Sequence, residues 1–434
     1  MAKVVPFRAL RYDPVKVRIE DVVTQPYDKI SPAMQDSYYA ADPHNLVRII
    51  LGKREPEDSE NKNVYSRAAN YFQTWRQQGV LHRDAEPSIY AYQQHFKVPG
   101  DPSGMRHRRS GFIALGKIQD YSDKIVFRHE QTLSKPKADR LNLLRATHAH
   151  FGQIFMLYSA AHDPLSSLTP HPAVQVTDEY GVEHKLWRIN DPRLIAQVQH
   201  EMSDKQLIIA DGHHRYETAL AFRNEMRQLR PDAGTEAPWE YVMMTFVNMD
   251  APGLVVLPTH RVVRGMEKFQ VSDLLSVASD YFSVEDVTGR FNPEQPSRLL
   301  EDDAPHFTYR TTLLAITADR AYRLRSRLES STAPAEVSAK ERELDVVQLH
   351  KLLLEKTLGM SEEDIRAQRF LSYIRDPREA VDSVRSGAAQ VAFLMNPVRI
   401  EQMRDIAFAG GVMPQKSTDF YPKLLSGLTI YALD

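Results

Sequence analysis

The spacing of apolar and polar positions predicts separate helices at several places in the chain. The pattern is clearest over residues 64–78, where Ala68, Phe72 and Trp75 fall on one face of a helix. Another helix is expected from about Ser31, because Ser-Pro provides an N-cap followed by a first-turn proline. The same reasoning predicts further helices over residues 135–148, 192–202, 216–229, 346–358 and 399–409.

Short apolar runs between the helices predict strands. Residues 88–94 and 109–118 flank a Pro-Gly-Asp-Pro-Ser-Gly string, a loop signal that fits a hairpin. Residues 4–30 combine short β-prone runs with prolines and are interpreted as strands and loops. Further strands are expected over residues 151–158, 207–210, 241–248, 253–257 and 389–395. Helices and strands mixed in this way predict an α/β (α+β) protein with mixed sheets.

The length of the chain, 434 residues, exceeds the usual size of one hydrophobic core. We expect three consecutive parts. Residues 1–158 form an N-terminal α/β part that contributes site loops, and residues 159–325 form a core that carries the central motif. Residues 326–434 form a C-terminal α/β part with a closing, lid-like segment. Residues 271–325 are expected to be a helix followed by strand, and the polar stretch 326–340 a loop or linker.

The amino-acid composition limits the kinds of functional site that the chain can form. Hydrophobic residues make up 42% of the chain and charged residues 26%, as in ordinary globular proteins, and no apolar run approaches the roughly 18 residues of a membrane span. The charged N-terminus does not resemble a secretory signal, so a cytoplasmic location is expected. The absence of cysteine excludes thiol nucleophiles and thiolate metal sites. With 55 basic and 57 acidic residues, no global field attracts nucleic acid, so any anion binding must be local.

One short segment carries the chemistry expected of a phosphate site. Asp211, Gly212, His213, His214 and Arg215 follow an apolar strand and precede a helix. A helix start presents unpaired backbone N–H groups and the positive end of the helix dipole, and a glycine lets the chain approach an anion closely. The segment therefore predicts a phosphate-binding turn.

The side chains of this turn have distinct expected roles. Arg215 can grip a phosphate with two N–H groups, and His213 and His214 add further donors. Asp211 would repel a bare phosphate, so we expect it to orient a histidine or to hold Mg²⁺ together with the phosphates. No metal cage built from protein alone is expected, because adjacent histidines point apart on a helix. The alternative is that Asp211 caps the helix and the histidines are surface polar residues, and the residues alone leave both open.

Several strings, occurring in the same order, resemble a bacterial and archaeal family of unknown function, and the match spans essentially the whole chain. The strings are Gln25–Asp28, His129–Glu130 with Thr132, Lys135–Lys137, Asp139–Leu141, Ile209–Glu217, Leu257–Arg261, Met413–Thr418 and Phe420–Lys423.

The Asp-Gly-His-His-Arg turn is similar to the nucleotide-binding turn of the ParB and sulfiredoxin superfamily, which includes CTP-binding partition proteins, ATP-using sulfiredoxins and free serine kinases. The resemblance implies a ParB/sulfiredoxin-like core in which Gly212, His213, His214 and Arg215 hold nucleotide phosphates. Sulfiredoxin chemistry requires a cysteine in this turn, which is absent here. Partition proteins require a helix-turn-helix and a dimerising tail, and neither signal is clear. The remaining branch implies a kinase that uses ATP or ADP with Mg²⁺ and acts on a free amino acid, with L-serine as the best single acceptor.

A kinase that acts on a hydroxyl needs a carboxylate near the nucleophile. Glu130 is the first choice for the base, because it lies just before a basic segment, and His129 beside it is a further catalytic candidate. Asp28 is the second carboxylate candidate. Each of these strings is equally consistent with an exposed turn.

Other basic residues are candidates for contacts to substrate or phosphate. We expect one of Lys135, Lys137 and Arg140 to contact the substrate or a phosphate. The alternative is that these residues form a solvated face, as basic residues at the start of a helix often do. His260 follows an apolar strand, where site residues often lie, but a strand-end histidine bonded to the backbone is the alternative. Lys416 lies in a closing segment that either folds over the site as a lid or is a docked tail.

Two functions from different classes remain. The first is a small-molecule kinase of serine metabolism that forms O-phosphoserine, and the second is a nucleotide-binding switch that regulates DNA or a partner protein. The near-neutral net charge of -2 favours the first, because DNA-binding proteins normally carry a clustered cationic face.

Overall fold

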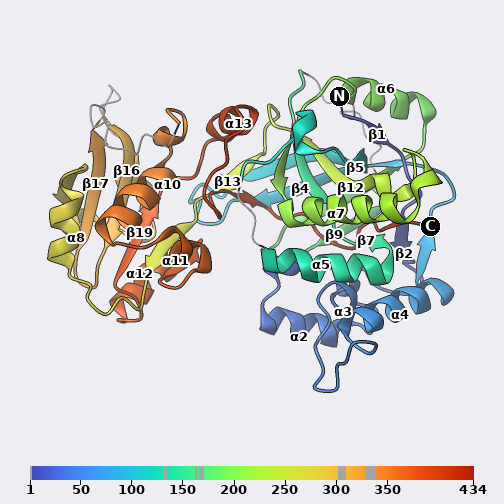
Figure 1. Ribbon diagram of the computed structural model, residues 1–434, viewed down its shortest axis with the longest axis horizontal. Helices are drawn as coiled ribbons and strands as arrows, with labels where there is room; N and C mark the ends of the chain where they lie inside the picture. The colour runs from blue at the N-terminus through green and yellow to red at the C-terminus, as the bar shows by residue number, and fades with distance from the viewer. Residues whose placement is uncertain (1, 131–133, 162–164, 166–170, 302–308, 328–337) are drawn as a thin grey trace. The chain divides into compact units, whose positions relative to one another are not determined.

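A computed structural model describes the chain except residues 1, 131–133, 162–164, 166–170, 302–308 and 328–337 (Figure 1). The side chains of residues 134–136, 309, 310 and 327 are also outside the description. Contacts divide the chain into two compact units, each described here by itself. Unit 1 comprises Met1–Arg128, Thr132–Leu254 and Pro422–Asp434, and unit 2 comprises His129–Gln131 and Val255–Tyr421.

This division differs from the three consecutive parts expected at residues 1–158, 159–325 and 326–434. The strand at Ile154–Tyr158 lies between the strands at Leu207–Asp211 and Tyr241–Asn248 and is hydrogen-bonded to both. A boundary at residue 158 would therefore cut through one sheet. Hydrogen bonding between strands distant in sequence leaves no local signal in composition, which is why the expected boundary fell there.

Unit 1 is built on a nine-stranded mixed sheet. Its strands are β1 (Val4–Val5), β4 (Ile89–Lys97), β5 (Arg106–Lys117), β6 (Val126–Phe127), β8 (Ile154–Tyr158), β9 (Val174–Thr177), β10 (Glu183–Ile189), β11 (Leu207–Asp211) and β12 (Tyr241–Asn248). They follow the order β6-β11-β8-β12-β5-β4-β10-β9, with β1 paired to β5. Every residue of β8 and β12 is buried, as expected for central strands covered on both faces.

Two short strand pairs and a set of helices complete unit 1. The pairs are β2 (Leu10–Tyr12) with β3 (Leu81–Arg83) and β7 (Ala149–His150) with β21 (Tyr431–Ala432). The helices are α1 (Ile19–Val22), α2 (Pro32–Ala41), α3 (Val47–Ile50), α4 (Val64–Gln77), α5 (Ser134–Thr147), α6 (Pro192–Met202) and α7 (His213–Leu229).

Helix α7 is fixed to the sheet by its own apolar face. Tyr216 and Ala219 are buried in the cluster that also contains Ile209 of β11 and Phe246 of β12. The Tyr216 hydroxyl donates to the carbonyl of Gln119 at 2.7 Å. Figure 1 shows α5 lying between α7 and the group α2, α3 and α4. The start of α7 is thus held on a rigid element, as a functional site requires.

Unit 2 contains a six-stranded antiparallel sheet with the order β15-β17-β16-β19-β14-β18. These strands are β14 (His260–Val263), β15 (Phe282–Asp286), β16 (Tyr309–Ile316), β17 (Ala321–Arg327), β18 (Leu371–Ile374) and β19 (Val391–Met395). A separate pair joins β13 (Val255–Leu257) to β20 (Asp419–Tyr421). The helices are α8 (Val271–Ala278), α9 (Ser297–Leu300), α10 (Asp345–Gln348), α11 (Glu362–Ala367), α12 (Pro377–Arg385) and α13 (Ile400–Phe408), with a π-helix at Leu349–Thr357.

The mixed α+β class predicted from the sequence is confirmed. The predicted helix over residues 346–358 is helical, but it is mostly a π-helix that continues α10. Strands β9 and β10 were not predicted. Most of the expected linker at 326–340 lies outside the described residues. None of the described helices combines the length and hydrophobicity needed to cross a membrane.

Candidate functional site

The predicted strand, turn and helix are confirmed around Gly212. Strand β11 ends at Asp211, Gly212 has φ +91°, and α7 begins at His213. Glycine is required here, since this left-handed backbone strains any residue with a Cβ. Gly212 occupies the N-cap position and no side chain caps the helix, so the alternative in which Asp211 caps α7 is wrong.

Asp211 is instead the anion of a cationic cluster. Its Oδ1 lies 3.1 Å from Lys423 Nζ, and its Oδ2 accepts from Arg215 Nη2 at 2.7 Å. Burial alone would raise the pKa of Asp211, but the charges of Lys423, Arg215 and Lys29 outweigh it and hold the pKa well below its ordinary range. Asp211 is therefore ionised, and cations outnumber it in this cluster.

Arg215 lies against the turn and does not extend into solvent. Its side chain is only 14% exposed. Besides Asp211, its guanidinium donates to the carbonyl of Gln153. A Cβ added to Gly212 would come within 3.0 Å of this guanidinium, and one added to Gly152 within 3.3 Å. The two glycines thus let a fixed, planar cation lie beside the N–H groups at the start of α7.

Lys423 reaches the site because buried side chains hold its backbone. Arg109 donates to the carbonyl of Pro422, and Gln94 Nε2 donates to the carbonyl of Lys423 at 2.8 Å. Arg109 also donates to Gln94 Oε1 at 3.0 Å and lies 4.7 Å from the ring centroid of Phe155. Burial lowers the pKa of Arg109 to about 10, so it remains cationic at neutral pH.

Gln153 adds buried polar groups beside the turn. The residue is 1% exposed, and neither its side-chain oxygen nor its nitrogen has a hydrogen-bond partner in the part of the chain that the structure describes. Buried polar atoms in proteins are almost always hydrogen-bonded to protein, water or ligand. The amide of Gln153 can therefore donate to and accept from a water molecule or a ligand near this turn.

The two histidines of the turn differ in exposure. His213, the first residue of α7, is buried, with 8% of its surface exposed. His214 is partly exposed. Their expected role as phosphate donors stays a prediction.

The other predicted site residues of unit 1 lie on α5 and before α2. Lys137 forms an ion pair with Glu217. Arg140 donates to the carbonyl of Ile50 at 2.6 Å and pairs with Asp139.

Two further candidates of unit 1 have fewer described contacts. Asp28 is exposed in a single 3₁₀ turn, Tyr27–Lys29. Lys135 belongs to α5, but its side chain is outside the described residues.

His129 and Glu130 belong to unit 2 and contact the closing segment there. His129 is fully buried, and its Nε2 lies 2.8 Å from Thr418 Oγ1. Glu130 Oε1 accepts from the backbone N–H of Ser417 at 3.2 Å. The closing segment is thus tied to this predicted catalytic pair by a backbone hydrogen bond as well as a side-chain contact.

His260 and Lys416 also belong to unit 2. His260 is 1% exposed and accepts from the Met395 N–H at 3.4 Å, and burial lowers the pKa of His260 to about 4. This is the backbone-bonded alternative, and a neutral buried imidazole makes a poor phosphate contact. Lys416 is exposed, and its carbonyl accepts from Arg261 at 3.1 Å.

Sequence reasoning missed several residues that build the Asp211 cluster. Lys29, Arg109 and Gln94 were not singled out, and Lys423 was named only within one of the strings that carry the family resemblance. The useful signal for Lys423 is its place in the string Phe420–Lys423, which belongs to the family resemblance. Arg109 gives no sequence signal, because it lies in an ordinary strand.

A comparison with known protein families shows which family the chain belongs to. The family model described as "Protein of unknown function (DUF1015)" matches residues 4–347. The chain belongs to this family. The DUF1015 description carries no activity, and none of the curated proteins compared with the chain matches it.

Solved structures give only weak similarities to this DUF1015 member. A conserved hypothetical protein from Pyrococcus furiosus has 12% identity and a TM-score of 0.35, with 72% of this chain and 92% of that chain covered. A free serine kinase in complex with AMP has 11% identity and a TM-score of 0.34, with coverage of 71% and 86%. SbnI with a C-terminal truncation, from Staphylococcus aureus, has 10% identity and a TM-score of 0.31, with coverage of 74% and 87%. These values are too low to transfer a ligand, an activity or a residue's role.

The described residues do not form a protein-only metal site. They contain no cluster of three or more His, Cys, Asp or Glu side chains arranged to hold a metal ion. Both carboxylate oxygens of Asp211 contact cations, Lys423 and Arg215.

Proposed function

We propose that this protein binds the phosphates of ATP or ADP at the turn Asp211–Arg215 and transfers a phosphoryl group to the hydroxyl of a small metabolite. Free L-serine, which would become O-phosphoserine, is the best single acceptor. The nature of the acceptor and of the donor rests on the resemblance of the turn to those of the free serine kinases.

One observation carries the proposal. A left-handed glycine opens the 17-residue helix α7, and Lys423, Arg215 and Lys29 gather around a single carboxylate beside it. The N–H groups of a helix start, the helix dipole and excess positive charge act together at this place, and each favours a polyanion. The buried Gln153 amide supplies further polar groups at the same turn.

The proposed reaction is an in-line displacement. The acceptor oxygen forms a bond to the terminal phosphorus of ATP or ADP, and the bond from that phosphorus to the rest of the nucleotide breaks. The leaving ADP or AMP takes the electron pair of that bond. The hydroxyl proton passes to a carboxylate base, with Glu130 as first candidate, Asp28 as second and His129 as a further catalytic candidate.

The chain's cations would neutralise charge that develops on the phosphates. Arg215 and Lys423 lie at the turn, while Lys137 and Arg140 lie on α5. Mg²⁺ enters this proposal as an ion carried by the nucleotide phosphates, where it would neutralise charge on the transferring group.

The test uses the purified full chain with Mg²⁺, either ATP or ADP, and L-serine or a pool of hydroxyl-bearing metabolites. Mass spectrometry that detects O-phosphoserine, or another phosphorylated acceptor, would support the proposal. Nucleotide binding without any product would favour the regulatory switch. Failure of both nucleotides to bind in calorimetry would overturn the proposal altogether.

A further inference from the structure

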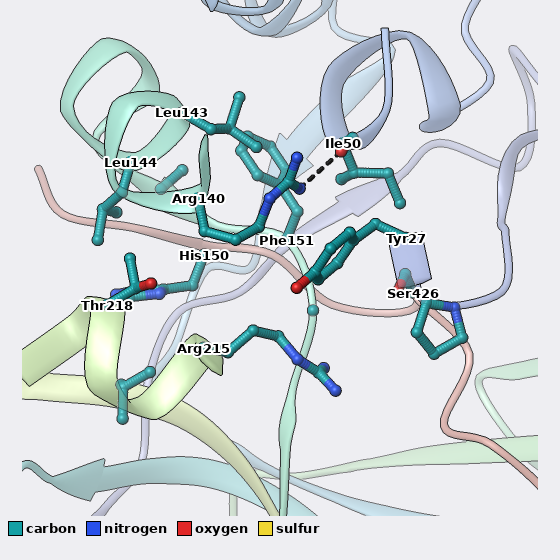
Figure 2. A pocket seen from close by; sticks show the side chains of 14 residues that line it. Tyr27, Ile50, Arg140, Leu143, Leu144, His150, Phe151, Arg215, Thr218 and Ser426 are labelled. Atoms are coloured by element: carbon teal, nitrogen blue, oxygen red, sulfur yellow. Dashed lines mark hydrogen bonds between the residues drawn. The ribbon is translucent and has the colours of Figure 1, made fainter. Parts of the chain in front are cut away.

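A pocket in unit 1 lies next to the turn and has no assigned role. It has a volume of about 70 Å³, several times the roughly 10–15 Å³ that one buried water needs. Ile50, Leu143 and Phe151 contribute apolar walls, while Arg140 and Arg215 bring charged groups to its edge. Figure 2 shows the two arginines on opposite sides of the pocket, with the Tyr27 ring between them.

Both guanidinium groups are fixed in place and retain unused donors. Arg140 is held by Asp139 and the carbonyl of Ile50, and its guanidinium carbon lies 4.1 Å from the ring centroid of Tyr27. Arg215 is held by Asp211 and the carbonyl of Gln153. A guanidinium has five N–H donors. Each arginine therefore keeps N–H groups that have no acceptor among the described residues.

Thr218 is a second, independent indication of a ligand. It lines the pocket, is 5% exposed, and its Oγ1 has no hydrogen-bond partner within the described part of the chain. Thr218 lies three positions after Arg215 on α7, a spacing that places both side chains on one face of the helix. A buried hydroxyl without a partner is costly, so this hydroxyl fits a molecule in the pocket that bonds to it.

The residues that line the pocket favour a carboxylate over a phosphate dianion. Burial lowers the pKa of His150 to about 4, so this lining residue is neutral and adds no positive charge. A phosphate dianion would lose most of its hydration against largely apolar walls, which is costly. A carboxylate carries a single charge and presents two oxygens that match the planar donor fork of arginine. A short carbon chain behind it would pack on Ile50 and Leu143.

We propose that this pocket binds the carboxylate of a small organic acid, with Arg140, Arg215 and Thr218 as donors. Because Arg215 also belongs to the phosphate turn, the bound acid would be held beside the nucleotide site. That the acid is the phosphoryl acceptor rests on the proposed function, whereas its binding does not.

Calorimetry on the full chain without nucleotide tests the binding. The probes are L-serine, D-glycerate and L-lactate, with serinol as the matched compound that lacks the carboxylate, and inorganic phosphate as the competing anion. We expect at least one of the three acids to bind, and serinol and inorganic phosphate to bind at least about tenfold more weakly, as expected when a charge-assisted hydrogen bond is lost. Equal binding of serinol, stronger binding of inorganic phosphate, or no binding of any acid would overturn the proposal.

The variant Thr218→Val tests whether the acid binds in this pocket. The change removes an unpartnered buried hydroxyl, so the melting temperature should stay the same or rise, while the affinity for the acid should fall about fivefold or more. Thr245→Val is the matched control, because Thr245 is also fully buried with an unpartnered hydroxyl in the described structure but does not line the pocket. The control should bind the acid like the natural protein.

The outcomes separate this inference from the proposed function. Acid binding that depends on Thr218, without any phosphoryl transfer, would support the pocket and count against the kinase. Phosphoryl transfer whose acceptor KM is unchanged in Thr218→Val would support the kinase and overturn the assignment of the pocket to the acceptor, and acid affinity that is also unchanged in Thr218→Val would overturn the pocket itself.

Discussion

Lys423 Nζ lies 3.1 Å from Asp211 Oδ1, although 212 positions separate the two residues in the chain. The Lys423 side chain is 9% exposed and that of Asp211 24%. The pair therefore lies largely out of solvent, and it fixes the C-terminal segment to the head of α7. Both stability and ligand binding should depend on it.

Asp211→Asn should lower the free energy of unfolding by about 2–3 kcal/mol at pH 7, because Lys423 and Arg215 lose their charged acceptor. The pKa of Asp211 is depressed in the folded state, so its contribution is fully present above the unfolded value of about 3.9 and is lost as the pH falls below that value. Urea unfolding from pH 7 to pH 2.5 checks this. The difference from the natural protein should shrink in acid, whereas Asp232→Asn, at an exposed position, should change little at any pH.

Gly212→Ala should destabilise the protein and weaken nucleotide binding. The left-handed backbone costs alanine about 1–2 kcal/mol, and the new methyl group also meets the Arg215 guanidinium at 3.0 Å. Gly100→Ala is the matched control, because Gly100 has φ +77° with nothing within 4 Å of an added Cβ. Thermal melts and nucleotide titrations compare the two. Equal losses of stability and unchanged nucleotide affinity would show that the contact with Arg215 has no role.

The local part of the site could be predicted from sequence, since it depends on neighbours in the chain. An apolar run, a glycine and a helical pattern are contiguous at residues 207–229, and the structure confirms the turn they predict. The role of Asp211 was harder to predict from the sequence. The two cations that pair with it directly come from four residues away on α7 and from the far C-terminal segment, and only the second contact needs the complete fold.

The parts that were missed depend on long-range packing. Strands β9 and β10 lie in a segment rich in Pro, His and Asp, and the hydrogen bonds of β10 to β4 stabilise them. Arg109 is buried because Gln94 and the carbonyl of Pro422 satisfy its guanidinium, and no local pattern reveals that pairing. The assignment of His129 and Glu130 to unit 2 likewise follows from contacts with residues near 413–418.

Arg215→Lys should weaken nucleotide binding by about 1.5–3 kcal/mol, because lysine keeps the charge but cannot bond to Asp211, Gln153 and a phosphate at once. The Arg215 side chain is only 14% exposed and is bonded to both Asp211 and the carbonyl of Gln153. A modest fall in melting temperature should accompany the loss. Arg193→Lys, in the exposed first turn of α6, is the control and should leave nucleotide affinity unchanged in calorimetry.

A chelator should abolish phosphoryl transfer without altering the melting temperature of the nucleotide-free protein. The reason is that the described residues hold no metal-binding cluster, whereas Mg²⁺ would arrive on the nucleotide. Differential scanning calorimetry with and without EDTA checks the melting temperature, and the product assay with and without EDTA checks phosphoryl transfer. Unfolding by EDTA would reveal a structural metal and would contradict the assignment of His213 and His214 as phosphate donors.

Glu130→Gln tests the base. The glutamine keeps an Oε1 that can accept from the Ser417 N–H, as Glu130 does at 3.2 Å, so the fold and the closing segment should survive. It cannot take the acceptor's proton, and general-base help is usually worth about a hundred- to ten-thousand-fold in rate. The expected result is a fall in kcat of that size with nearly unchanged nucleotide affinity, the pattern of a group that acts mainly in the transition state. Asp28→Asn is the comparison, because Asp28 is an exposed carboxylate that should tolerate the change structurally. Loss of rate in the Asp28 variant alone would move the base to Asp28, and full activity in both would leave neither carboxylate with a role in proton transfer.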